Sequence, residues 1–222
     1  MSSLRVLHVD DEPDIREVVE LSLGLDAAFS VRSCASGADA LAVAADWSPD
    51  IILCDVMMPV MDGPATLARL RAQAQTANTP FVFMTARAQT REIEHFKSLG
   101  ATGVIAKPFD PITLARSVRQ QLRLAGLSAL RDGFIRRMRS DAEKLTSCKA
   151  SLQNESTSQQ ALEQIKSYSH ALSGAAGIFD FQEVGRAASA LEKSAINRLE
   201  GVQAPEKVES DLDALLDCMG RQ

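Results

Sequence analysis

Hydrophobic and polar positions follow two different periods along the chain. Up to about residue 124, short apolar runs alternate with stretches in which apolar residues recur every three or four positions. This alternation of strands and helices predicts an α/β domain with a parallel sheet. The expected strands are residues 4–9, 29–33, 51–54, 81–84 and 103–106, and the expected helices are 14–25, 37–46, 62–74, 90–99 and 111–124.

After residue 125 the strand pattern stops. Four amphipathic stretches follow, separated by polar breaks, and they predict an all-α, up-down four-helix bundle over residues 127–222. Gly126 is the expected hinge between this bundle and the α/β domain of residues 1–124. The stretches run over residues 127–152, 162–179, 184–199 and 208–219.

Reactive side chains stand at the ends of the expected strands. These residues are Asp10 and Asp11 after the first strand, Asp55 at the third, Thr85 at the fourth and Lys107 at the fifth. The carboxyl ends of parallel strands share one edge of a sheet, so we expect these five side chains to converge there. Clustered carboxylates suit Mg²⁺, which also neutralises phosphoryl oxygens. An aspartate can then accept a phosphoryl group, while a hydroxyl and an ammonium contact its oxygens.

Residues 1–124 resemble a response-regulator receiver domain. The motifs are VDDEP at 9–13, DVMMPVMDG at 55–63, TA at 85–86 and KPF at 107–109. The resemblance implies a flavodoxin-like, five-stranded sheet in the order 2-1-3-4-5. It implies Asp55 as phosphoacceptor, and Thr85 and Lys107 as the pair that senses the phosphoryl group. The implied Mg²⁺ ligands are Asp10, Asp11, Asp55 and the backbone carbonyl of Met57.

Two positions in this half bear on how the resemblance applies. Receivers often carry Tyr or Phe three residues before the lysine, and this chain has Val104, which makes switching through an aromatic side chain doubtful. Met57 follows Asp55 by two residues and cannot orient a water, so we expect slow hydrolysis of the phosphoryl group. Of the other histidines, His8 is expected in the core and His95 on the surface.

His170 is the candidate reactive residue of the second half. On a helix, Leu172 lies about 160° from His170, so the apolar stripe faces away from the imidazole. The histidine's own face carries small or polar residues, including Ser173, Gly174 and Gly177. Glycine costs about 1 kcal/mol inside a helix. The two glycines therefore suggest space for another protein beside an exposed imidazole.

Residues from about 127 to 220 resemble a histidine-containing phosphotransfer (HPt) domain. The motifs are HALSGAAG at 170–177 and LE at 191–192. The resemblance implies that His170 accepts a phosphoryl group. The family often has Lys three residues after the histidine, where this chain has Ser173, and Lys166 is a possible substitute one turn earlier.

Together the two resemblances predict a phosphorelay protein of a two-component system. We expect Asp55 to take a phosphoryl group from the phosphohistidine of a histidine kinase or hybrid kinase, with Mg²⁺. We expect His170 to exchange one with receivers of other proteins and not with Asp55 of its own molecule. The chain would then be a signalling protein and not an enzyme. The alternative is a phosphorylation-gated binding module whose helical domain takes no phosphoryl group.

Charge and composition weigh against other classes. The net charge is −5, and residues 126–222 have 12 Lys and Arg against 14 Asp and Glu, which argues against a nucleic-acid binder. The sequence has neither an apolar run long enough for membrane insertion nor a secretory signal. Four scattered cysteines favour a cytoplasmic location with reduced thiols. Nothing resembles the Gly-rich nucleotide-binding domain of a complete histidine kinase.

Overall fold

The computed structural model describes residues 3–202 and 204–221, with the backbone alone for Glu155. The chain divides into two compact units, residues 1–127 and 128–222. Each unit has its own hydrophobic core, and each is described by itself below.

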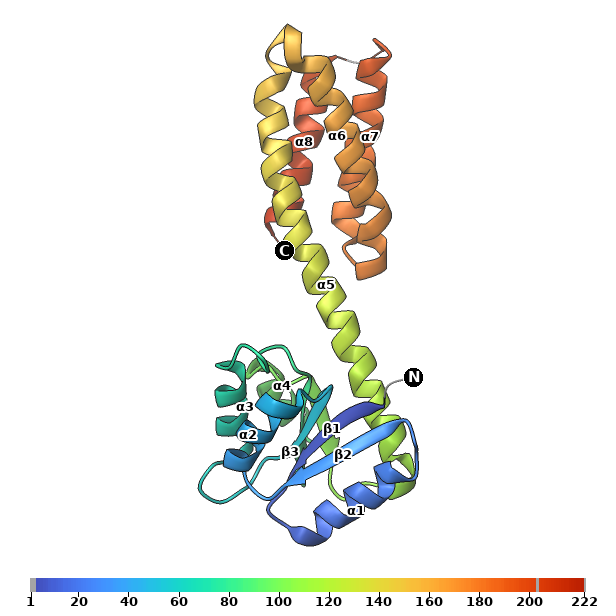
Figure 1. Ribbon diagram of the computed structural model, residues 1–222. Helices are drawn as coiled ribbons and strands as arrows, with labels where there is room; N and C mark the ends of the chain where they lie inside the picture. Colours follow the sequence, from blue (N-terminus) through green and yellow to red (C-terminus); the bar gives the residue numbers. More distant parts are fainter. Residues whose placement is uncertain (1–2, 203, 222) are drawn as a thin grey trace. The chain divides into compact units, whose positions relative to one another are not determined.

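The first unit is built on a five-stranded parallel sheet (Figure 1). Its strand order, β2-β1-β3-β4-β5, confirms the predicted fold. The central strand β3 and its neighbour β4 are buried at every residue, which is typical of parallel strands covered on both faces. The strands are β1 (Leu4–Val9), β2 (Phe29–Cys34), β3 (Ile51–Asp55), β4 (Phe81–Thr85) and β5 (Gly103–Ala106).

Helices cover both faces of this sheet (Figure 1). On one face, Val19 and Leu23 of α1 and Leu114 and Val118 of α5 pack in a common core. Helices α2, α3 and α4 contribute to the core on the other face. The helices are α1 (Pro13–Gly24), α2 (Gly37–Trp47), α3 (Gly63–Arg71), α4 (Thr90–Ser98) and α5, which begins at Pro111.

The start of α3 is fixed close to the end of β3. The Asp62 side chain accepts a hydrogen bond of 2.8 Å from the backbone N–H of Ala65 and so caps the helix. At Gly63 a Cβ atom would lie 2.5 Å from the carbonyl oxygen of Asp55. Glycine is therefore needed for this approach, which holds the loop after Asp55 against the sheet.

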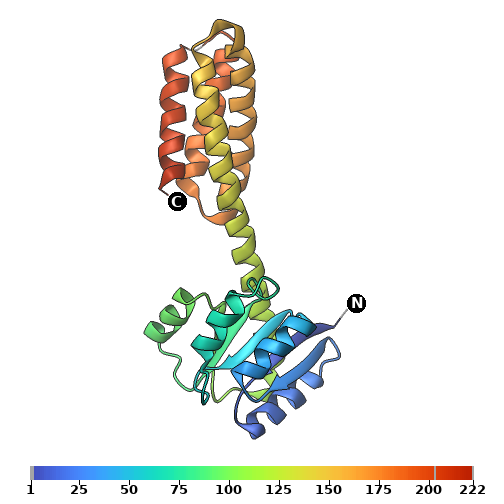
Figure 2. The ribbon, with the colours of Figure 1, turned by 60° about the vertical axis from the view of Figure 1, so that its left-hand side comes forward.

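The second unit is a helical bundle (Figure 2). It combines the part of α5 after residue 127 with α6 (Glu155–Ala176), the short 3₁₀ helix η1 (Gly177–Phe179), α7 (Gln182–Leu199) and α8 (Pro205–Gly220). Apolar residues at helical spacing meet in one core, as the sequence pattern predicted. Fully buried members include Leu145, Ile165, Ala188, Leu191, Leu212 and Leu215.

The break predicted between two helices at Gly126 is absent, although the two units divide close to it, between Leu127 and Ser128. Helix α5 runs without interruption from Pro111 to Leu152. One glycine lowers helix stability by only about 1 kcal/mol, and the helix propensity of the residues on either side outweighs this cost. Leu127 and Leu130, predicted at the start of the bundle stripe, are 61% and 62% exposed. The buried stripe of α5 in this unit includes Phe134, Met138 and Leu145.

In the part of the chain that the structure describes, no helix combines the length and apolar character needed to cross a bilayer.

Candidate functional site

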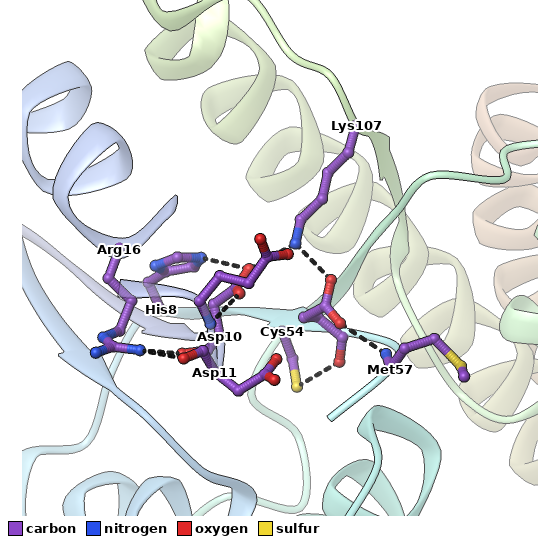
Figure 3. Close-up of polar contacts among 9 residues, drawn as sticks. His8, Asp10, Asp11, Arg16, Cys54, Met57 and Lys107 are labelled. Carbon is purple, nitrogen blue, oxygen red and sulfur yellow. Dashed lines mark hydrogen bonds and ion pairs between the residues drawn. The ribbon is translucent and has the colours of Figure 1, made fainter. Parts of the chain in front are cut away.

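An ammonium and two carboxylates meet at the edge of the sheet where the strands end. Lys107 Nζ donates to Asp10 Oδ2 at 2.6 Å and to Asp55 Oδ1 at 2.5 Å. Figure 3 shows the lysine side chain reaching into this group from the segment that follows β5. Asp10 is fully buried and Asp55 is 8% exposed. The predicted convergence of strand ends therefore brings residues 97 positions apart into direct contact.

The charges in this cluster balance only in part. Burial alone would lower the pKa of Lys107, but its hydrogen bonds and ion pairs with Asp10 and Asp55 outweigh burial and raise it. Burial, followed by the charges of Lys107 and Arg16, lowers the pKa of His8 to about 3. This histidine, fully buried as predicted, is therefore neutral and does not help the lysine to offset the acids.

Asp55 and Thr85 line a common pocket of about 450 Å³. Asp55 Oδ2 accepts a hydrogen bond of 2.7 Å from the backbone N–H of Met57, which orients the carboxylate. Thr85 Oγ1 accepts one of 3.1 Å from the N–H of Arg87, so its own proton stays available for a ligand in the pocket. The Met57 side chain is 80% exposed.

Asp11 completes the acidic group but has a different environment. Its side chain is partly exposed, and its backbone carbonyl accepts a hydrogen bond of 2.9 Å from Arg16 Nη1. The same nitrogen donates to the Asp10 carbonyl at 2.7 Å, so Arg16 holds the turn between β1 and α1 (Figure 3). This role of Arg16 could not be predicted, because a guanidinium that binds two backbone carbonyls produces no recognisable spacing of residues in the sequence.

The donor set suits a hard divalent cation. Asp10, Asp11 and Asp55 supply carboxylate oxygens, and one lysine leaves the group with excess negative charge. Within the described residues, no three His, Cys, Asp or Glu side chains stand close enough together to form a metal site. Lys107 Nζ contacts both Asp10 and Asp55 and so lies between these two carboxylates.

Val104, the position that departs from the receiver pattern, lies on β5 opposite Phe83 of β4. It is partly buried and packs against the core formed with α2, α3 and α4. Its small side chain has no polar atom, so it cannot move a hydroxyl toward Thr85.

The second candidate residue, His170, lies on α6 with its side chain 78% exposed, as predicted. Its Nδ1 atom lies 2.9 Å from Glu192 Oε1 of α7. A carboxylate oxygen accepts hydrogen bonds, so in a neutral imidazole this contact favours the tautomer with the proton on Nδ1 and the lone pair on Nε2. Glu192 belongs to the HPt-like motif, but its contact with the imidazole could not be predicted, because it depends on how α6 packs against α7.

The residues around His170 are small, and Lys166, the candidate cation, binds another residue. Ser173 Oγ donates to the His170 carbonyl at 3.0 Å, and Lys166 Nζ binds Glu163 at 3.3 Å. A Cβ atom at Gly174 or Gly177 would meet nothing within 4 Å. These glycines are not needed for packing inside the chain, which keeps the space beside the imidazole open.

Family models match both halves of the chain. The response regulator receiver domain model matches residues 6–119, and the Hpt domain model matches residues 129–221. The chain belongs to the response-regulator receiver family and carries an Hpt domain. Both are modules of two-component phosphorelay signalling, and neither is a kinase domain.

Individual relatives agree with the receiver assignment. The DNA-binding dual master transcriptional regulator RpaA of Synechocystis sp. is 36% identical over 120 residues, which are 54% of this chain and 49% of RpaA. The transcriptional regulatory protein DltR of Streptococcus agalactiae is 33% identical over 152 residues, 67% of this chain and 66% of DltR. The chemotaxis response regulator CheY4 of Vibrio cholerae has a TM-score of 0.51 at 37% identity, covering 54% of this chain and 99% of CheY4. The chain spans about half the length of RpaA and about two thirds of DltR.

Proposed function

We propose that the chain is a phosphorelay protein in which Asp55 and His170 each carry a phosphoryl group. The observation that supports this most directly is the contact of Lys107 Nζ with Asp55, in the same chain as an exposed histidine oriented by Glu192. One site has an oriented carboxylate beside a cation, and the other has a nitrogen lone pair open to solvent.

At the receiver site, an Asp55 oxygen attacks the phosphorus of a phosphohistidine. The P–O bond forms as the P–N bond breaks, and the electron pair of that bond returns to the imidazole of the donor. Lys107 is already placed to compensate charge on the phosphoryl oxygens, and the Thr85 hydroxyl donates to one of them.

Asp10, Asp11, Asp55 and the Met57 carbonyl would hold Mg²⁺, which supplies positive charge to the phosphoryl oxygens and relieves carboxylate repulsion. The chemistry of these donors supports the assignment.

At the bundle site, Nε2 of His170 is the nucleophile. With the proton held on Nδ1 by Glu192, attack through the Nε2 lone pair creates positive charge on the ring. The Glu192 carboxylate stabilises that charge, and transfer onward returns a neutral imidazole.

The partners we propose are a histidine kinase or hybrid kinase as donor and receivers of other proteins as partners of His170. In this role the chain is a signalling protein that assists its own phosphorylation, rather than an enzyme acting on a separate substrate. All four cysteines are free thiols, which fits the proposed cytoplasmic location.

Chemical labelling tests the proposal. Wild type, Asp55→Asn and His170→Gln are incubated with phosphoramidate, which can phosphorylate both aspartate and histidine, and the sites are read by mass spectrometry. We expect two labels on wild type and one on each variant. When EDTA is present during the labelling, we expect only the Asp55 label to be lost. Absence of label on Asp55 in Mg²⁺ would refute the receiver mechanism.

Two further measurements test the lifetime of the Asp55 label and the alternative function. Met57 offers no group that orients water, so we expect the Asp55 label to outlast several minutes after donor removal, and loss within seconds would contradict this. The alternative, a binding module with an unphosphorylated bundle, requires that His170→Gln leave signalling intact in the cell. The exposed, oriented imidazole favours the phosphotransfer function instead.

A further inference from the structure

His8 is a fully buried polar residue whose ring is left without hydrogen bonds. It lies on β1, in register with Leu53 of β3 and Ser33 of β2, so its side chain faces the core that α1 and α5 form with the sheet. Among the described residues, neither ring nitrogen of His8 has a hydrogen-bond partner. Such an imidazole lowers stability, because it has given up its hydrogen bonds to water and gained none in the protein.

The core alone gives no reason for a histidine at this position. Val6, two residues earlier on the same face of β1, is apolar and belongs to one core with Val19 of α1 and Leu53. An apolar side chain at position 8 would extend this core without burying polar atoms. Packing therefore explains why position 8 is buried but not why it carries an imidazole.

The ring of His8 is directed at Asp10, the most deeply buried acid of the receiver site (Figure 3). Its Nε2 atom lies 3.8 Å from Asp10 Oδ2, which is about 1 Å longer than a hydrogen bond. An imidazole carries a proton on at least one nitrogen, and the nearby carboxylate favours Nε2 as its place. His8 thus presents a donor to an acceptor that lies just out of reach.

The oxygen that His8 faces is already bound by Lys107. Lys107 Nζ donates to Asp10 Oδ2 at 2.6 Å, while Asp10 Oδ1 accepts from the backbone N–H of Glu12 at 3.1 Å. The same ammonium contacts Asp55, where it is placed to compensate charge on phosphoryl oxygens. If Lys107 turns toward a phosphoryl group on Asp55, Asp10 Oδ2 loses its donor inside the protein, and the Nε2–H of His8 is in place to replace it.

We propose that His8 is a positioning residue for Asp10 in the phosphorylated receiver. As Lys107 turns to the phosphoryl group, the Nε2–H of His8 donates to Asp10 Oδ2 and keeps this carboxylate in place for Mg²⁺. The proposal rests on the proposed function, since it requires a phosphoryl group on Asp55. It gives the buried imidazole the hydrogen bond that packing does not provide.

Mg²⁺ titrations of the full chain test the proposal. His8→Gln places an amide N–H as many bonds from the backbone as Nε2, His8→Asn places the same group at the position of Nδ1, and His8→Leu has no donor. The matched control is Ser33→Ala, because Ser33 is paired with His8 in the sheet and its hydroxyl is also buried without a partner among the described residues. Each chain is titrated with Mg²⁺ alone, followed by calorimetry, and with Mg²⁺ in the presence of beryllofluoride, which mimics a phosphoryl group on a carboxylate and is followed by ¹⁹F NMR.

The effect of His8 should appear only in the presence of the phosphoryl mimic. With beryllofluoride, we expect the half-maximal Mg²⁺ concentration to rise about tenfold in His8→Leu and His8→Asn, the effect of one hydrogen bond to a carboxylate, and to be unchanged in His8→Gln and Ser33→Ala. With Mg²⁺ alone, all chains should bind equally, because Lys107 still holds Asp10. A purely structural role of His8 would change both titrations.

The ring proton of His8 provides a second readout, in the wild-type chain. In ¹⁵N-labelled protein, the Nε2–H signal should move downfield when Mg²⁺ and beryllofluoride are added, because a charge-assisted hydrogen bond to a carboxylate deshields the proton. The His8 signals are identified by their absence from the spectrum of His8→Gln. This measurement decides the question even where the leucine or asparagine variant does not fold.

Four results would overturn the proposal. These are an unchanged Mg²⁺ dependence of beryllofluoride binding in His8→Leu, a loss that His8→Gln does not restore, a loss of the same size in Ser33→Ala or with Mg²⁺ alone, and a ring proton signal that does not move. In each case Asp55 still binds beryllofluoride, so the proposed function stands. A wild-type chain that binds no beryllofluoride in Mg²⁺ would refute the receiver mechanism itself.

Discussion

Replacement of Glu192 separates two contributions to the reactivity of His170. Glu192→Gln keeps an oxygen that can accept from the imidazole N–H but removes the charge. Glu192→Ala removes both. The contact is a single one of 2.9 Å between α6 and α7, so neither change disturbs a wider network of hydrogen bonds around the ring.

The size of each effect follows from exposure. The His170 side chain is 78% exposed and that of Glu192 is 23% exposed, so solvent screens the pair strongly. We therefore assign about 1 kcal/mol to the charge acting on the phosphorylated ring and about 1 kcal/mol to orientation by the hydrogen bond. The labelling rate of His170 should fall about fivefold in Glu192→Gln and about thirtyfold in Glu192→Ala.

The assay measures the rate of His170 labelling by phosphoramidate in an Asp55→Asn background, which leaves one acceptor. Glu163→Gln is the matched control. Glu163 is an acid on the same helix as His170, but its carboxylate binds Lys166 and not the imidazole. Thermal unfolding checks that the bundle is intact. Equal rates in the Glu192 variants, Glu163→Gln and the parent would refute the proposed role of Glu192, as would a loss in Glu163→Gln of the same size.

Three further predictions follow from buried groups. Lys107→Met should lower the free energy of unfolding by about 3 kcal/mol in urea titrations with EDTA, because Asp10 and Asp55 lose their shared cation; an unchanged midpoint would contradict this. Ile165→Ala, at a fully buried position, should cost about 3 kcal/mol in the same measurement, and a loss below 1 kcal/mol would show that the bundle core is loosely packed. Cys218 should react with iodoacetamide first, because burial raises the pKa of the other three thiols, and mass spectrometry that finds one of those modified earlier would refute this.

Much of the receiver site could be predicted because its residues stand at strand ends. A parallel sheet brings the carboxyl ends of its strands together, so Asp10, Asp55, Thr85 and Lys107 had to lie near one edge once the strands were recognised. The sequence could not show that Lys107 Nζ bridges two carboxylates, because that depends on the rotamer of a long side chain and on the depth of burial.

The bundle site was predictable to a smaller extent. Helical periodicity placed His170 opposite the core stripe, and the structure confirms its exposure. Its partner Glu192 is 22 residues away on another helix, so the contact depends on the packing of α6 against α7. Periodicity also failed at Gly126, because it reports which face of a helix is apolar and not whether a helix continues through a glycine.

The sequence by itself determined the two-part organisation, the strand order implied by the receiver motifs, and the identity of the side chains that we propose to carry phosphoryl groups. These follow from local pattern and from motifs, which are properties of short segments. Only the tertiary structure decided the bridging position of Lys107 between two carboxylates and the contact of the His170 imidazole with Glu192. Both depend on atoms that packing within each unit brings together, and neither is encoded in the spacing of residues along the chain.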